Sequence, residues 1–273
     1  MSTESRNPRS IGLDKMTAKE VVRLMNEEEH AVFRAMQSAE DQIALVAEKT
    51  AEAFQRGGRT IYVGAGTSGR VATMDAAEMP PTFGIDDDRF VAVFAGGLTA
   101  QATSDEDAED DEHRAILALN DLKLSADDIV IGVTASGRTP FVLSAVKHAG
   151  QKGVWTCGIA NNADTPLLEM VDLPILLDTG PEILTGSTRL KAGTAQKLAL
   201  NRISTVAMVL SGKVIENLMV DVKASNQKLK ERCVKIVRDL STVSEQEARR
   251  LLEMHDWNIR KVLDVVREPA KKS

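Results

Sequence analysis

Hydrophobic residues gather into five short runs in the middle of the chain. Each run is rich in valine and isoleucine and is apolar at nearly every position rather than at alternate ones, which is typical of strands buried on both faces of a parallel sheet. Helical patterns separate the runs, and this alternation predicts an α/β fold, a three-layer αβα sandwich with a five-stranded parallel sheet. The predicted strands are Thr60–Gly64, Phe90–Phe94, Ile129–Thr134, Val154–Ile159 and Leu173–Leu177.

Helical patterns also flank this central region on both sides. A capping box at Thr17 and Glu20 predicts a helix that continues to about Ala35, after an irregular arm over residues 1–15. Further helices are predicted at Glu40–Gln55, Leu190–Leu210 and Leu229–Val237, with two short ones from Ser244 to Val266 that break around Asp256–Asn258. We therefore expect an N-terminal arm with helices (1–57), a central α/β domain (58–225) and a small C-terminal helical module (226–273).

Composition narrows the class of protein. The chain has 273 residues, 43% of them hydrophobic, and a formal net charge of -6, which argues against a nucleic-acid-binding protein with a basic face. The sequence has no secretory segment and no apolar run near the ~20 residues that span a bilayer. Two distant cysteines and four unpaired histidines predict neither a disulfide nor a metal centre. We therefore expect a cytoplasmic protein that does not bind a membrane.

Two of the predicted strands end in similar glycine- and hydroxyl-rich loops. The first loop is GAGTSGR (Gly64–Arg70) and the second is TASGRTP (Thr134–Pro140), and each precedes a helix. Helix N-termini and hydroxyl groups bind anions, glycine allows close approach, and arginine supplies charge. The loops predict a phosphorylated ligand, and its candidate contacts are Thr67, Ser68, Arg70, Ser136, Arg138 and Thr139.

The first loop also fits the dinucleotide pattern G-x-G-x-x-G, so NAD binding is an alternative. That pattern expects an acidic residue about 20 positions later, at the end of the next strand. Here the next strand ends in Ala95-Gly96-Gly97, and the second loop has no role in dinucleotide binding. These points favour a phosphate site, while a second alternative is that the glycines only form tight turns.

A third polar cluster, Gly180–Lys197, opens the long apolar helix. It contributes Ser187, Arg189 and Lys191 as further candidate contacts of an anion at a helix start. The alternative is ordinary helix capping by Ser187 or Thr188. Glu182 in the same cluster could contact a ligand or pair with Arg189.

Candidate catalytic carboxyl groups lie in two segments. Glu78 lies in DAAEMPP close to Asp75, and Glu109 lies in the acidic run Ser104–His113. A glutamate in an acidic run is usually solvated or placed at a helix start. The pattern alone neither selects Glu109 nor prefers Glu78 to Asp75.

Five motifs occur in an order that resembles the bacterial N-acetylmuramic acid 6-phosphate etherases, a family with the sugar isomerase (SIS) fold. The resemblance runs from about Asn7 to Val237, and more loosely beyond. It implies cleavage of the ether between D-lactate and C3 of the sugar, without a cofactor, in cell-wall sugar recycling. It also implies a homodimer with active sites near the subunit interface and a C-terminal module similar to a ubiquitin-associated domain. The motifs are GAGTSGR, DAAEMPPTFG, ASGRTP, GPEILTGSTRLKAGTAQK and NLMVDVKASNQKL.

The resemblance also assigns the two catalytic carboxyl groups. It implies that Glu109 removes the C2 proton of the ring-opened sugar and that a protonated Glu78 helps lactate leave from C3. Two departures lie beside the base: Leu98 stands where the family usually has glutamate, and Asp107 stands where it has glycine. Aspartate is less suited than glycine to a position that needs positive φ.

Two rival functions remain open on the same fold. A phosphosugar isomerase would interconvert aldose and ketose phosphates and release no lactate. A non-catalytic regulator, similar to the glucokinase regulatory protein, would bind phosphosugars and leave them unchanged.

Overall fold

The computed structural model of the chain describes residues 2–97, 107–224 and 226–267. These residues divide into two compact units, which are described separately below. The first unit comprises residues 1–77 and 88–207, and the second comprises 78–87 and 208–273. The three-part division at residues 57/58 and 225/226 stays a prediction.

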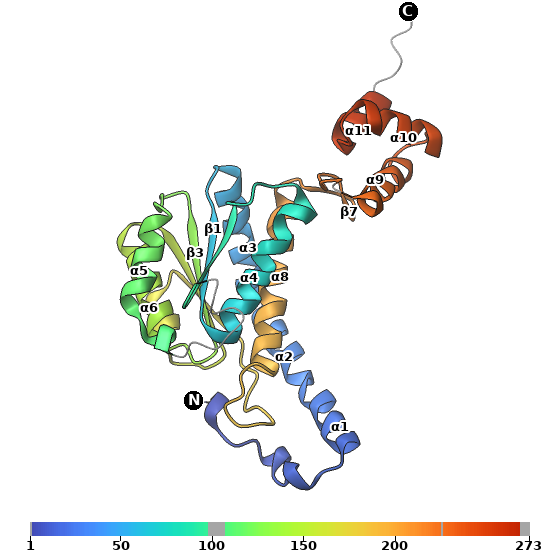
Figure 1. The fold of residues 1–273 in the computed structure, drawn as a ribbon. Helices are drawn as coiled ribbons and strands as arrows, with labels where there is room; N and C mark the ends of the chain where they lie inside the picture. The colour runs from blue at the N-terminus through green and yellow to red at the C-terminus, as the bar shows by residue number, and fades with distance from the viewer. Residues whose placement is uncertain (1, 98–106, 225, 268–273) are drawn as a thin grey trace, which may run out of the picture. The chain divides into compact units, whose positions relative to one another are not determined.

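A five-stranded parallel sheet forms the centre of the first unit (Figure 1). The strand order is β2-β1-β3-β4-β5, so the predicted sheet is confirmed. All residues of β1 and β3 are buried, as the continuous apolar runs predicted. The strands are β1 (Thr60–Gly64), β2 (Phe90–Phe94), β3 (Ile129–Thr134), β4 (Trp155–Ala160) and β5 (Leu173–Leu176).

Helices cover both faces of this sheet. On one face α6 (Pro140–Gln151) packs over β1 and β3 and α5 (Glu112–Asp121) packs beside it next to β2, with Phe141, Val142 and Leu119 in the core (Figure 1). The other face is covered by α3 (Glu40–Gln55) and by the parts of α4 and α8 that belong to this unit. The remaining helices are α4 (Gly66–Phe83), α7 (Pro166–Met170) and α8 (Lys191–Leu210).

The N-terminal helical region consists of two consecutive helices. The prediction of one helix that continues to about Ala35 is therefore wrong. The capping box at Thr17 opens α1, but α1 (Ala18–Glu28) ends before α2 (His30–Ser38) begins. Between the two helices the N–H of Val32 donates to the carbonyl of Glu29, an i→i+3 hydrogen bond of the 3-10 type, which tightens the chain there. The break lies in the polar run Asn26–His30, which is also compatible with an exposed turn of a continuous helix, so the sequence pattern did not reveal it. The preceding arm consists of three short 3-10 turns, Ser2–Glu4, Pro8–Ser10 and Leu13–Lys15.

The second unit is a small helical module with its own core. A short hairpin, β6 (Val214–Ile215) and β7 (Leu218–Met219), precedes α9 (Gln227–Asp239), and Cys233, Val234, Leu252 and Val262 are among the core residues. The predicted break at Asp256–Asn258 is confirmed, because Asp256 and Trp257 adopt left-handed φ of 52° and 60°. The last two helices are α10 (Glu245–Met254) and α11 (Ile259–Arg267).

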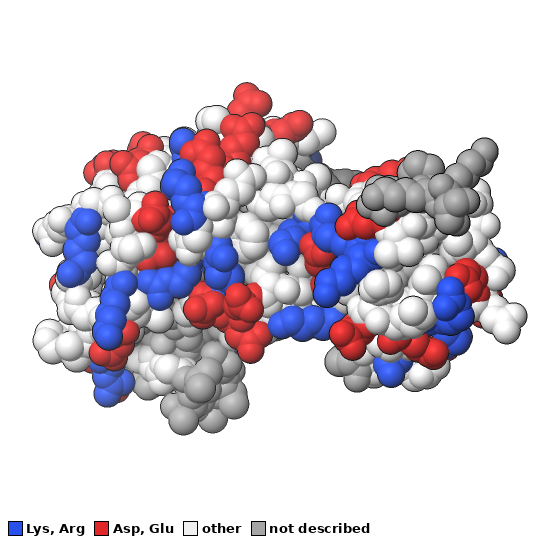
Figure 2. Space-filling view, turned by 90° about the horizontal axis from the view of Figure 1, so that it is seen from above, with Lys and Arg blue, Asp and Glu red and all other residues white. Residues whose placement is uncertain are grey.

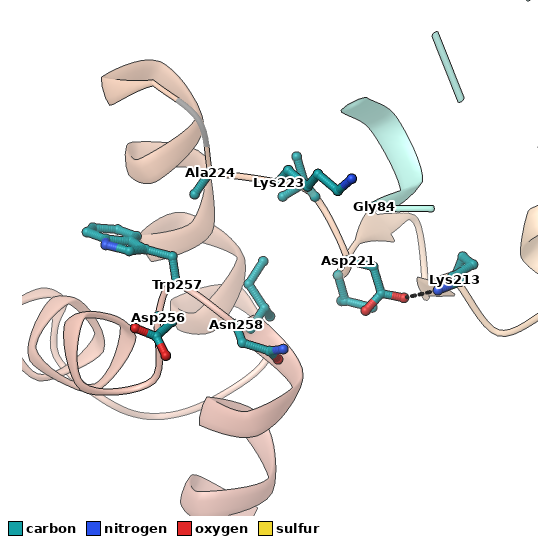
Figure 3. A pocket seen from close by; sticks show the side chains of 11 residues that line it. Gly84, Lys213, Asp221, Lys223, Ala224, Asp256, Trp257 and Asn258 are labelled. Carbon is teal, nitrogen blue, oxygen red and sulfur yellow. Dashed lines mark ion pairs between the residues drawn. The ribbon is translucent and has the colours of Figure 1, made fainter. Parts of the chain in front are cut away.

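A pocket of about 500 Å³ lies within this second unit. Figure 3 shows Trp257 and Asn258 of the α10–α11 turn on one side and Lys223 and Asp221 on the other. Asp221 is already paired, with Lys213 at 3.4 Å and with Arg260 at 2.5 Å. Of the two acidic residues that line this pocket, Asp221 and Asp256, the first is therefore engaged in ion pairs within the protein.

Surface charges of both signs are interspersed on the face seen in Figure 2. Basic side chains do not gather there into a region of one sign. Binding of an anion on that face would therefore depend on local donors rather than on a general basic field. Within the described ranges, no helix is long and apolar enough to cross a membrane.

Candidate active site

The two predicted phosphate loops leave neighbouring strands at the same edge of the sheet. Gly64, at the end of β1, pairs with Val133, next to the end of β3. In the first loop α4 begins at Gly66, and Ser68 in its first turn is buried at 7% exposure. Gly64 has to be glycine, because a Cβ there would lie 2.8 Å from the backbone nitrogen of Gly69. The first loop is thus a tight turn whose helix start faces the ligand edge of the sheet.

Three hydroxyl groups gather in the second loop. The Thr134 hydroxyl lies 2.7 Å from that of Thr139 and 3.2 Å from that of Ser136. The backbone N–H of Arg138 donates to the Ser136 hydroxyl at 3.1 Å, while its guanidinium donates to the Asp164 carbonyl at 3.2 Å. Ser136 and Thr139 are half-buried, so their hydroxyl groups are held in place and still partly accessible.

The predicted base, Glu109, lies directly beside the first loop. It comes from the 3-10 turn Asp107–Asp110, and its Oε1 lies 2.8 Å from the position that a Cβ would take on Gly66. Gly66 has a left-handed φ of 52°, which glycine adopts readily. Residues far apart in the sequence therefore place a carboxyl group at the start of α4.

The structure also separates Asp75 from Glu78. Asp75 is buried at 4% exposure and accepts hydrogen bonds from Tyr62 at 2.9 Å, Asn201 at 2.6 Å and Ser204 at 3.1 Å. Burial raises the pKa of Asp75, although these donors oppose the shift. Asp75 therefore joins β1, α4 and α8 as a structural carboxyl group.

Glu78, by contrast, is exposed near the end of α4. It belongs to the second unit, so it is not among the residues that the first unit brings together. Its accessible side chain remains the better candidate for contact with a substrate.

In the third loop a carboxylate caps the long helix. Glu182 is fully buried, and its side chain accepts from the backbone N–H groups of Lys191 at 3.2 Å and Ala192 at 2.9 Å. Glu182 thus provides the cap expected from Ser187 or Thr188, and burial raises its pKa. Ser187 is half-buried in the turn that precedes α8.

Lys191 does not present its ammonium group to the ligand edge. Nζ donates to Glu28 at 2.7 Å and to the Pro181 carbonyl at 2.9 Å, and the residue is only 3% exposed. Although burial opposes the shift, hydrogen bonds from Lys191 and Asn7 lower the pKa of Glu28. The structure therefore gives Lys191 a structural ion pair, and direct contact with an anion would require this pair to open.

The other predicted cations lie at different depths. Arg189 is exposed in the third loop, and Arg70 is half-buried with its guanidinium carbon 5.7 Å from the centre of the Phe94 ring. Thr67 contacts the first turn of α8, since its Cγ2 lies 3.0 Å from the position of a Cβ on Gly193. The first loop and the start of α8 are therefore in direct contact.

Two residues, Leu98 and Asp107, differ from the family pattern that the sequence resembles, and Asp107 is the one that lies within the described residues. Asp107 lies in a 3-10 turn and is not among the described non-glycine residues with positive φ. The aspartate therefore introduces no backbone strain of the kind that glycine would relieve. Leu98 lies outside the described residues.

Comparison with known proteins identifies the family. The chain is 47% identical over 253 residues to an N-acetylmuramic acid 6-phosphate etherase of Geobacillus sp. (strain WCH70), covering 93% of this chain and 86% of that relative. An N-acetylmuramic acid 6-phosphate etherase from Actinobacillus pleuropneumoniae serotype 7 (strain AP76) is 41% identical over all of this chain and 90% of its own length. The chain belongs to the N-acetylmuramic acid 6-phosphate etherase family.

Domain models agree with this etherase assignment. A SIS domain model matches residues 113–203, and a model of the glucokinase regulatory protein N-terminal SIS domain matches residues 42–149. A model of the C-terminal lid domain of glucokinase regulatory protein matches residues 216–267. The predicted SIS fold with N-terminal helices and a C-terminal helical module is thereby confirmed.

Among solved structures, the fold is similar to that of phosphoheptose isomerases. One from Francisella tularensis has a TM-score of 0.55 at 17% identity, over 70% of this chain and 98% of that one. One from Neisseria gonorrhoeae has a TM-score of 0.53 at 22% identity, over 70% and 99%. At these identities the likeness concerns the fold alone.

Sequence reasoning missed three residues that support the site. Glu28, Asn7 and Asn162 are buried or nearly so, and each bonds to a segment next to a predicted loop. Asn7 and Asn162 carried a weak signal, because asparagine is common at turns and helix starts. Glu28 carried none, since it lies among several glutamates on α1.

Proposed function

We propose that this chain cleaves the D-lactyl ether of N-acetylmuramic acid 6-phosphate, giving N-acetylglucosamine 6-phosphate and D-lactate. The etherase relatives, at 41–47% identity over nearly the whole chain, support this substrate. The structural observation that carries the proposal is the carboxyl group of Glu109 beside Gly66, at the start of α4. A base and a phosphate loop then share one edge of the sheet.

The phosphoryl group is proposed to bind where the first two loops adjoin. Ser68 and the hydroxyl cluster of Ser136 and Thr139 supply donors at neighbouring strand ends, and Ser187 adds one from the third loop. Thr67, Arg70, Arg138 and Arg189 are the secondary candidates. Lys191 is proposed to act mainly by holding the third loop, because its ammonium is paired with Glu28.

The proposed reaction is an elimination followed by addition of water. In the ring-opened sugar the aldehyde acidifies the C2 proton, which Glu109 takes up. The electron pair left on C2 forms the C2–C3 double bond, the C3–oxygen bond breaks, and protonated Glu78 gives its proton to the lactate oxygen. Water then adds at C3 of the unsaturated aldehyde. Each proton transfer contributes about 10²- to 10⁴-fold.

The positive end of the α4 dipole is suited to the first step. A negatively charged carboxylate is favoured beside a helix start. The position of Glu109 beside this helix start therefore suits a group that must accept a proton. Glu78, the proposed acid, lies near the other end of the same helix.

We also propose that the chain acts as a homodimer in the cytoplasm, in cell-wall sugar recycling. An apolar groove of about 450 Å³ on the first unit, lined in part by Phe33, Met36, Ile43 and Val206, supports a subunit contact. Phe33 is 59% exposed and Val206 is 39% exposed. Both cysteines are free and buried, in keeping with a reducing compartment.

The deciding experiment is incubation of the pure chain with N-acetylmuramic acid 6-phosphate and measurement of D-lactate. Release of D-lactate together with N-acetylglucosamine 6-phosphate is the expected result. An aldose–ketose isomerase would change the sugar without releasing lactate, and a non-catalytic regulator would return the substrate intact. Either outcome would refute the proposal.

A further inference from the structure

The N-terminal arm, Ser2–Lys15, is attached to the ligand edge of the sheet by two buried asparagines. The first is Asn162, which follows β4 and is 2% exposed. Its Nδ2 donates to the Thr3 hydroxyl and to the Ala135 carbonyl, both at 2.8 Å. Its Oδ1 accepts from the Thr3 N–H and the Ser2 hydroxyl, both at 3.2 Å. All four hydrogen-bonding positions of this amide are therefore used.

The second is Asn7, which lies in the arm itself and is 4% exposed. Its Nδ2 donates to Glu28 at 2.8 Å and to the Pro181 carbonyl at 3.2 Å, and its Oδ1 accepts from the Arg9 N–H at 2.9 Å. A single side chain thus joins the arm to α1 and to the segment that opens the third loop.

These attachment points lie next to the proposed phosphate contacts. Ala135 directly precedes Ser136 in the second loop, and Pro181 lies at the start of the third loop, Gly180–Leu190, which carries Ser187. These bonds to the two loops are accepted by backbone carbonyls and not by the hydroxyl groups that are proposed to hold the phosphoryl group. Thr3, the residue of the arm that bonds to Asn162, is fully buried.

The attachment at Pro181 is reinforced by the buried ion pair. Lys191 Nζ donates to the same two acceptors as Asn7, namely Glu28 Oε2 and the Pro181 carbonyl. The Lys191 and Glu28 side chains are only 4% and 11% exposed. Groups buried in this way are costly to leave unpaired, so the base of the third loop is held firmly.

We propose that the N-terminal arm is a clamp that fixes the spacing between the second and third loops, with Asn162 and Asn7 as its positioning residues. This inference rests on the proposed function, because the loops matter as phosphate contacts. Neither asparagine touches the substrate. Loss of the clamp would weaken phosphoryl binding equally in the ground state and the transition state, and would therefore raise KM while leaving kcat nearly unchanged.

The test uses the full chain with Asn162→Asp, which keeps the shape of the side chain and removes both donors. The expected result is a rise in KM of about tenfold with kcat within about twofold. Amide hydrogen exchange without ligand should become faster in residues 134–139 and 181–190, as well as in the arm. Asn120→Asp is the matched control, because Asn120 is exposed on α5, and it should change neither quantity.

Thr3→Val is a milder second variant, which removes the hydroxyl group from the arm side and leaves both loops intact in sequence. If Asn162→Asp does not fold, Thr3→Val decides the question with the same two readouts. Exchange that becomes faster in the arm alone, with KM unchanged, overturns the clamp. A wild-type chain that releases no lactate refutes the proposed function instead, and the exchange data on the loops still decide whether the clamp exists.

Discussion

A methyl group added at Gly66 should displace the carboxyl group of Glu109, the proposed base, at a modest cost in stability. In Gly66→Ala the new Cβ would lie 2.8 Å from Glu109 Oε1, a distance that carbon and oxygen do not tolerate. The carboxyl group would have to move by several tenths of an ångström or more. The left-handed φ of 52° adds a backbone cost of about 1–2 kcal/mol.

These two effects can be separated by a matched control. Gly153 also has a left-handed φ, of 76°, and a Cβ there meets nothing within 4 Å. Gly153→Ala should therefore show the backbone cost alone, a fall in Tm of about 2–6 °C. Gly66→Ala should show a similar fall in Tm together with a loss of kcat.

We expect kcat for lactate release to fall by about 10²-fold in Gly66→Ala, because a misplacement near 1 Å can cost that much. Glu109→Gln should lose about 10²- to 10⁴-fold. Initial rates of D-lactate release from N-acetylmuramic acid 6-phosphate measure both. If folded Gly66→Ala keeps kcat within about threefold of Gly153→Ala, Glu109 is not the base at this position.

Two further predictions concern the acid and the buried ion pair. Glu78→Gln should abolish lactate release while N-acetylglucosamine 6-phosphate still binds with nearly unchanged affinity by calorimetry, and normal turnover would exclude Glu78 as the acid. Glu28→Gln leaves Lys191 buried without a charged partner and should cost about 3–5 kcal/mol of unfolding free energy, measured by urea denaturation. Because the fold lowers the pKa of Glu28 below 4.5, its contribution to stability is present above that pH and is lost as pH falls through the folded pKa. The difference in stability between wild type and Glu28→Gln should therefore shrink in acid, and a constant difference would contradict the assignment.

The sheet could be predicted from the sequence because its strands are buried on both faces. Three strands begin and end where the apolar runs do, while β4 is shifted by one residue at both ends and β5 is one residue shorter at its C-terminal end. The break at Glu29 could not be predicted, since it depends on one tightened hydrogen bond within the polar run Asn26–His30, which a continuous helix could also contain. A local change in backbone geometry of this kind cannot be recognised from the sequence pattern.

The site was predictable to a smaller extent. The two loops were visible because glycine and hydroxyl residues follow strands at fixed positions. The choice between Asp75 and Glu78 needed burial, and the contact of Glu109 with Gly66 joins residues far apart in the chain, so local spacing could not reveal it. The pairing of Lys191 with Glu28 was hidden for the same reason.

The hydrogen bond from Tyr62 to Asp75 has an optical consequence. Tyr62 is the single tyrosine of the chain, it is fully buried, and burial raises its pKa well above the usual value. The pKa of its phenol is therefore raised while the junction of β1, α4 and α8 is closed, and opening of that junction makes the phenol easier to ionise in alkaline solution. The two tryptophans of the chain lie in different units, Trp155 in the first and Trp257 in the second. The chain thus carries separate natural chromophores from which the melting of each unit can be followed without an added dye.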